Sequence, residues 1–89
     1  MTDLERARKI INEADAQMAE LFTKRMDAVK AVAEYKKQNG LPIFDAAREE
    51  EVVAKNLTLM REEYAEYYEK FIRSNMEISK EYQKKLLGE

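Results

Sequence analysis

The sequence predicts an all-α protein that opens with one long helix and forms a homodimer. Apolar and small residues recur at alternating steps of three and four over the first third of the chain, which is helical spacing. Two Gly and one Pro in 89 residues leave room for few turns. A helix of some 35 residues spans about 50 Å, whereas a compact chain of this length has a radius of gyration of about 12 Å. The long helix would extend beyond one chain, so we expect a two-fold dimer.

The first helix is predicted over Leu4 to Lys36, with a continuation to about Asn39. Thr2 or Asp3 can cap its start, and Gly40 can supply the left-handed residue at its end. Its packing seam consists of nine apolar or small residues: Leu4, Ala7, Ile11, Ala14, Met18, Leu21, Ala28, Val32 and Tyr35.

One position in this seam carries a charge. Arg25 stands where the spacing calls for a hydrophobe, and a guanidinium in an apolar seam needs an anionic partner to offset its desolvation. Lys36 follows on the same stripe, about 16 Å along the axis, and two long side chains leaning inward could meet on one small dianion. Alternatively, Arg25 pairs with an acidic residue of a neighbouring helix and Lys36 is solvated.

The second half of the chain is also predicted to be helical. Asp45 is a good N-cap, and acidic residues fill the turns that follow it. Glu49 precedes two valines by three and four residues, so it shares their face and should point inward. No Gly or Pro occurs between Asp45 and Leu87, so the residues alone permit one second helix, and the pattern does not decide whether it breaks near Glu62-Glu63.

The composition excludes several classes of function. The chain has neither Cys nor His, which excludes thiolate nucleophiles, Ser-His-Asp triads and the usual zinc sites, and we expect no cofactor or metal. A net charge of -2 argues against nucleic-acid binding. No apolar run approaches the roughly 20 residues that span a membrane, and a signal-peptide pattern is lacking. Residues 1–89 are interpreted as a single, cytoplasmic domain.

Other polar residues are weaker candidates on their own. Arg8 lies about 25 Å from Arg25 along the helix, so it could reach the same ligand only from the partner of an antiparallel dimer; otherwise it is a surface arginine. Ser79 and Gln83, four residues apart, could present two hydrogen-bonding groups to one cavity or be tolerated polar residues. Arg48 could form an exposed helix pair with the glutamate that follows it.

Taken together, these residues resemble the small all-helical chorismate mutases. The resemblance covers Leu4 to about Leu86. Asn12 stands where that family often has Asp, and Lys24 where it often has Glu, but neither is a ligand position. The stretch from Thr58 to Tyr67 matches poorly. The matching motifs are Arg8, Ile11-Asn12, Asp15, Leu21-Phe22, Arg25 and Lys36, then Pro42-Ile43-Phe44-Asp45-Ala46-Ala47-Arg48-Glu49, and finally Ser79 with Gln83.

The resemblance implies three helices per chain, one long and two shorter, in an intertwined homodimer with two active sites. The reaction implied is the Claisen rearrangement of chorismate to prephenate, in the shikimate branch leading to phenylalanine and tyrosine, which uses no cofactor. Each site would bind the dianion in a chair-like conformer. The implied roles are carboxylate binding by Arg25 and the partner's Arg8, assisted by Arg48 and Ser79; donation to the ether oxygen by Lys36 and Gln83; and acceptance from the ring hydroxyl by Glu49, with Asp45 nearby.

Two other functions compete with this interpretation. An isochorismate pyruvate-lyase shares the fold and the pericyclic chemistry, although Glu49 as an acceptor for the ring hydroxyl favours chorismate. A non-catalytic helical dimerisation module would use Arg25 only as a buried ion pair that sets the helix register.

Overall fold

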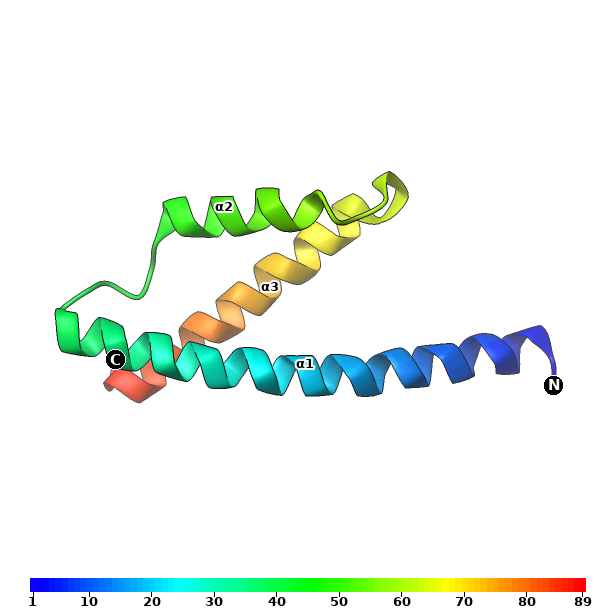
Figure 1. Ribbon diagram of the computed structural model, residues 1–89, viewed down its shortest axis with the longest axis horizontal. Helices are drawn as coiled ribbons and strands as arrows, with labels where there is room; N and C mark the ends of the chain where they lie inside the picture. Colours follow the sequence, from blue (N-terminus) through cyan, green and yellow to red (C-terminus); the bar gives the residue numbers. More distant parts are fainter.

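The computed structural model describes residues 1–89 and contains three helices and no strand: α1 (Asp3–Asn39), α2 (Ala46–Leu57) and α3 (Glu62–Leu87) (Figure 1). The predicted all-α class, with one long N-terminal helix and two shorter ones, is confirmed. The C-terminal half of α1 and α2 both pack against α3, whereas the N-terminal half of α1 projects beyond the other helices (Figure 1).

Local sequence signals set both ends of α1. Thr2 is the N-cap: its hydroxyl accepts from the Glu5 N–H at 3.1 Å, while the Glu5 carboxylate accepts from the Thr2 N–H at 3.4 Å. Gly40 ends the helix with a φ of 62°, and the Leu41 N–H donates back to the Lys36 carbonyl at 2.9 Å. The resulting helix of 37 residues runs almost the full 55 Å length of the chain.

The predicted start of α2 is confirmed. The sequence pattern leaves open whether the second half of the chain forms one helix or two, and the structure shows a break after α2. The Asp45 carboxylate caps α2 by accepting from the Arg48 N–H at 3.0 Å. At the other end, the Thr58 hydroxyl donates to the Lys55 carbonyl at 2.6 Å, so a side chain takes over one of the last helix carbonyls. The chain turns over residues 58 to 61 without Gly or Pro and re-enters a helix at Glu62.

The core of a single chain is small and lies mainly between α2 and α3. Only six of 89 residues are buried. Val53, one of the two valines that follow Glu49, packs with Ile72 and Met76 of α3. So small a core offers little apolar burial to stabilise one chain alone.

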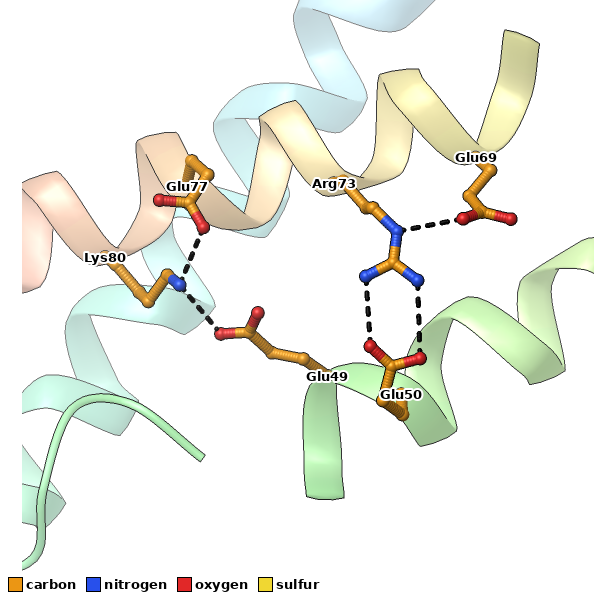
Figure 2. Close-up of polar contacts among 6 residues, drawn as sticks. All are labelled: Glu49, Glu50, Glu69, Arg73, Glu77 and Lys80. Atoms are coloured by element: carbon orange, nitrogen blue, oxygen red, sulfur yellow. Dashed lines mark hydrogen bonds and ion pairs between the residues drawn. The ribbon is translucent and has the colours of Figure 1, made fainter. Parts of the chain in front are cut away.

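An ion-pair cluster reinforces the α2 and α3 contact on its outer side. Arg73 of α3 donates to both oxygens of Glu50 in α2, at 3.1 and 3.3 Å (Figure 2). Its Nε also donates to Glu69, one turn earlier on α3, at 3.0 Å. The bidentate geometry fixes the register of the two helices more than a single ion pair would.

The seam of α1 is largely exposed in a single chain. Its large apolar residues are exposed along the N-terminal half: Leu4 by 58%, Ile11 by 56%, Met18 by 45% and Leu21 by 62%. The radius of gyration is 16.3 Å, well above the roughly 12 Å of a compact chain of this length. The predicted packing seam is therefore present but uncovered in one chain. None of the three helices combines the length and apolar character needed to cross a membrane.

Candidate active site

A pocket of about 170 Å³ lies between the C-terminal half of α1, the loop over residues 40 to 45, α2 and α3. It brings together residues that are up to 58 positions apart in the sequence. Seven of the eight predicted site residues line it: Arg25, Lys36, Asp45, Arg48, Glu49, Ser79 and Gln83. The structure thus gathers these side chains in one place, while their roles toward a substrate stay predictions.

Arg25 faces this pocket from α1, and its partner differs from the one expected. Its Nη1 donates to the Ser79 hydroxyl, which in turn donates to the Asn75 carbonyl at 2.9 Å. No carboxylate of the chain forms an ion pair with Arg25, so the expectation of an anionic partner is wrong within one chain. The guanidinium is half-buried rather than enclosed, so a neutral hydroxyl and the open pocket suffice to solvate it. Its positive charge remains available to a ligand.

Lys36 brings a second cation to the same pocket. Its Nζ donates to the Ile43 carbonyl at 2.7 Å, which ties the loop after α1 back to the helix. Like Arg25, Lys36 forms no ion pair in this chain, and it is half-buried. Val29 and Val32 lie between the two cations and form an apolar floor.

Arg48 lies at the edge of the pocket. Its guanidinium donates to Glu51 at 2.8 Å, and its side chain is 61% exposed. An exposed ion pair of this kind contributes little to stability. The Arg48 guanidinium can therefore leave Glu51 and bind a ligand with only a small loss of free energy. Arg48 does form an exposed helix pair, but with Glu51 rather than with Glu49.

Glu49 points inward, as its position relative to the valines predicts. Its carboxylate pairs with Lys80 of α3 at 3.0 Å, and both side chains are less than one-fifth exposed. Lys80 also pairs with Glu77 at 2.7 Å (Figure 2). Hydrogen bonds to Glu77 and Glu49 raise the pKa of Lys80 above its ordinary value, since both carboxylates stabilise the charged form.

Lys80 lines the pocket and was missed by the sequence reasoning. A signal was present: Lys80 follows Ile72 and Met76 at successive steps of four, so it occupies the next position of a buried apolar stripe. This is the same kind of departure that identifies Arg25 on the first helix.

Gln83 supplies a neutral polar group. The residue is only 6% exposed, and its Oε1 is buried with no hydrogen-bond partner. An unpaired buried acceptor costs about 1 to 3 kcal/mol. Such a residue at a pocket wall is typical of a site that serves binding rather than folding.

Arg8 is the one predicted site residue that the pocket does not include. It lies on the projecting half of α1, is exposed, and makes no hydrogen bond or ion pair in this chain. A helical separation of about 25 Å from Arg25 keeps the two residues from sharing a small ligand within one chain, as the sequence spacing predicts.

The pocket suits a small organic dianion. Two cations without carboxylate partners and a third at the rim face a partly apolar cavity, with a buried amide and a hydroxyl beside them. No group of three or more acidic side chains lies close enough together to hold a metal ion.

No curated protein and no solved structure matches this chain. The family model described as chorismate mutase type II matches residues 7–84, which is most of the 89-residue chain and includes every residue of the pocket. The chain therefore belongs to the chorismate mutase type II family.

Proposed function

We propose that this protein is a chorismate mutase that rearranges chorismate to prephenate. The family supports a mutase-type activity. The observation that carries the proposal is the pair of cations, Arg25 and Lys36, that converge on one pocket without a carboxylate partner. Chorismate is a dianion, so its charges match those that the pocket leaves uncompensated.

The chemistry of this reaction fits the side chains available. One ether C–O bond breaks and one C–C bond forms within the same molecule, so no nucleophile, proton donor or electron carrier is consumed. Catalysis then consists of holding a reactive chair-like conformer, worth up to about 7 to 11 kcal/mol in favourable cases, and of stabilising negative charge on the breaking oxygen, worth about 3 to 4 kcal/mol per donor.

We assign carboxylate binding to Arg25, which Ser79 orients through its hydroxyl. Arg48 assists from the rim after leaving Glu51. Lys36 donates to the ether oxygen, since an ammonium has three donors and only one is used by the Ile43 carbonyl.

Two further contacts complete the proposed substrate site. Gln83 turns its amide toward the ether oxygen beside Lys36. Glu49 accepts a hydrogen bond from the ring hydroxyl, with Asp45 close by at the start of α2. This acceptor is the feature that favours chorismate over its isomer isochorismate.

We further propose that the active enzyme is an intertwined homodimer and that the partner's Arg8 completes each site. The uncovered seam of α1 and the small core of one chain support a dimer. A single-chain pocket of about 170 Å³ is also smaller than the usual 300 to 1,000 Å³ of small-molecule sites, as expected where a second chain supplies one wall.

The direct test is product analysis with purified protein. Chorismate and isochorismate are incubated separately, and products are separated by chromatography against the uncatalysed rate. We expect prephenate from chorismate, a loss of this activity in Arg25→Ala, and retention of it in Lys24→Ala, which removes the neighbouring exposed cation. Sedimentation shows whether each variant keeps the oligomeric state of the parent.

Other results would assign another function. Pyruvate and salicylate formed only from isochorismate would identify a pyruvate-lyase. Inactivity on both substrates, together with a melting temperature that a bicyclic diacid leaves unchanged, would indicate a non-catalytic dimerisation module.

A further inference from the structure

We propose that Lys80 is a positioning residue for the mutase reaction, which holds the Glu49 carboxylate so that one of its oxygens faces the ring hydroxyl of the substrate. This inference rests on the function proposed above. It assigns a role to a pocket cation that belongs to none of the motifs carrying the family resemblance.

Lys80 contacts residues of three elements of the fold: α2, its own helix α3, and the loop between α1 and α2. From α3 its ammonium reaches Glu49 of α2 at 3.0 Å and Glu77 of its own helix at 2.7 Å (Figure 2). The same ammonium lies 4.6 Å from the centre of the Phe44 ring in the loop after α1. Contacts with three different elements leave the Lys80 side chain little rotational freedom. The ordered ammonium can therefore hold the Glu49 carboxylate in one position.

One of the two carboxylate oxygens of Glu49 has no hydrogen-bond donor in the chain. Lys80 binds the Oε2 atom, whereas the Oε1 atom accepts no hydrogen bond from any residue of the chain. Figure 2 shows no contact from the other Glu49 oxygen to any of the residues drawn. A carboxylate with one oxygen bound and the other unpaired presents a single acceptor in a set direction, which is what recognition of one hydroxyl requires.

Burial distinguishes this ion pair from one that only joins the helices. Lys80 and Glu49 have side chains that are 16% and 19% exposed, whereas Arg73 and Glu50, which also join α3 to α2, are 42% and 67% exposed. The outer pair already fixes the helix register. A second, less exposed pair at the pocket wall carries a larger desolvation cost, and a role in the site accounts for its presence there.

A double-mutant cycle tests this role. Lys80→Met removes the ammonium and keeps the length of the side chain, while Lys80→Arg keeps a cation. Lys84→Met, which removes the exposed lysine one turn further along α3, is the matched control. Each lysine change is made in the parent enzyme and in Glu49→Ala, and chorismate turnover is measured together with the melting temperature.

We expect Lys80→Met to lower kcat/KM by about 10- to 100-fold in the parent, because a misplaced group can cost about 100-fold. In Glu49→Ala the same change should cost less than about twofold, since no carboxylate remains to be held. Lys80→Arg should keep at least half of the parent's kcat/KM. The kcat/KM of Lys84→Met should stay within about twofold of the parent value.

Each other outcome overturns the inference. An equal loss from Lys80→Met in both backgrounds would show that Lys80 acts independently of Glu49, and a fall in melting temperature that accounts for the lost activity would show a structural role. If the parent is active and Lys80→Met leaves kcat/KM unchanged, the role of Lys80 is refuted and the proposed function stands. An inactive parent would overturn the proposed function and this inference with it.

Discussion

Arg25 shows how a single residue can point from a sequence pattern to a site. A charge in an apolar seam is costly unless the structure compensates it. Here the compensation is a serine hydroxyl and an open pocket, so the charge remains available to a ligand. Lys80 on α3 is likewise a charged residue at a position of an apolar stripe, and it also lines the pocket. Charged residues within apolar stripes therefore mark two of the three helices that line this site.

Lys36 is expected to provide the interaction that grows most in the transition state, because charge develops on the ether oxygen only as that bond breaks. Lys36→Ala should lower kcat by about 100- to 1,000-fold, with a much smaller rise in KM. Steady-state kinetics with chorismate measure both constants. Lys37→Ala, which removes the next, exposed lysine of α1, serves as the control. An unchanged kcat in Lys36→Ala would remove Lys36 from this role.

At the scale of elements, the contact between α2 and α3 positions half of the pocket, because α2 carries Arg48 and Glu49 while α3 carries Ser79 and Gln83. Val53 and its neighbours on α3 supply the apolar part of this contact. Arg73 and Glu50 supply its polar part at the surface. Loosening the contact would separate the two halves of the site without touching any residue that faces the ligand.

The Arg73 and Glu50 pair predicts a pH-dependent stability. Hydrogen bonding and charge attraction from Arg73 hold the pKa of Glu50 below its ordinary value of 4.5. A carboxyl whose pKa is lower in the folded state stabilises the fold above its unfolded pKa, and this contribution is lost as the pH falls through the folded pKa. Glu50→Gln should therefore lower the melting temperature at pH 7, and the difference from the parent should disappear as the pH falls below 4.5.

Thermal unfolding followed by circular dichroism between pH 3 and pH 7 measures this effect. Glu66→Gln, which changes an exposed glutamate of α3 that forms no ion pair in the chain, is a suitable control. A Glu50→Gln difference that persists unchanged at low pH would contradict the assignment of this stability to the ion pair.

At the scale of the whole molecule, the uncovered seam of α1 predicts that one chain is not the working unit. Ile11 belongs to the seam and is 56% exposed, whereas Ile10 is 65% exposed but lies outside it. Ile11→Glu should weaken the proposed dimer strongly, because it would bury a carboxylate without a partner at the interface. Ile10→Glu should leave the dimer intact. Sedimentation over a range of protein concentrations distinguishes the two variants, and equal behaviour would contradict the seam as the interface.

Sharing of Arg8 between chains can be tested by mixing inactive variants. Arg8→Ala and Arg25→Ala each damage both sites of their own homodimer. In a mixed dimer, one site combines an intact Arg25 with an intact Arg8 from the partner. Unfolding and refolding an equal mixture should therefore restore about one-quarter of the parent activity, since half of the dimers are mixed and each has one whole site. If Arg8 served its own chain, no activity would return.

The sequence by itself determined the features that depend on local signals. Helical spacing, the cap at Asp45 and the glycine at position 40 predict the bounds of α1 and the start of α2, because each acts within a few residues of the backbone it controls. Motif spacing also named seven residues that line the pocket. These residues carry the family resemblance, so they could be identified without knowing how the helices pack.

Only the tertiary structure decided what depends on contacts between distant segments. The turn between α2 and α3 contains no Gly or Pro. We attribute its position to the packing of Val53 of α2 against Ile72 of α3. The choice of Ser79 as the partner of Arg25, and of Glu49 as the partner of Lys80, joins residues that are 54 and 31 positions apart. Periodicity assigns a residue to a face of its own helix, but it does not say which residue of another helix that face will meet.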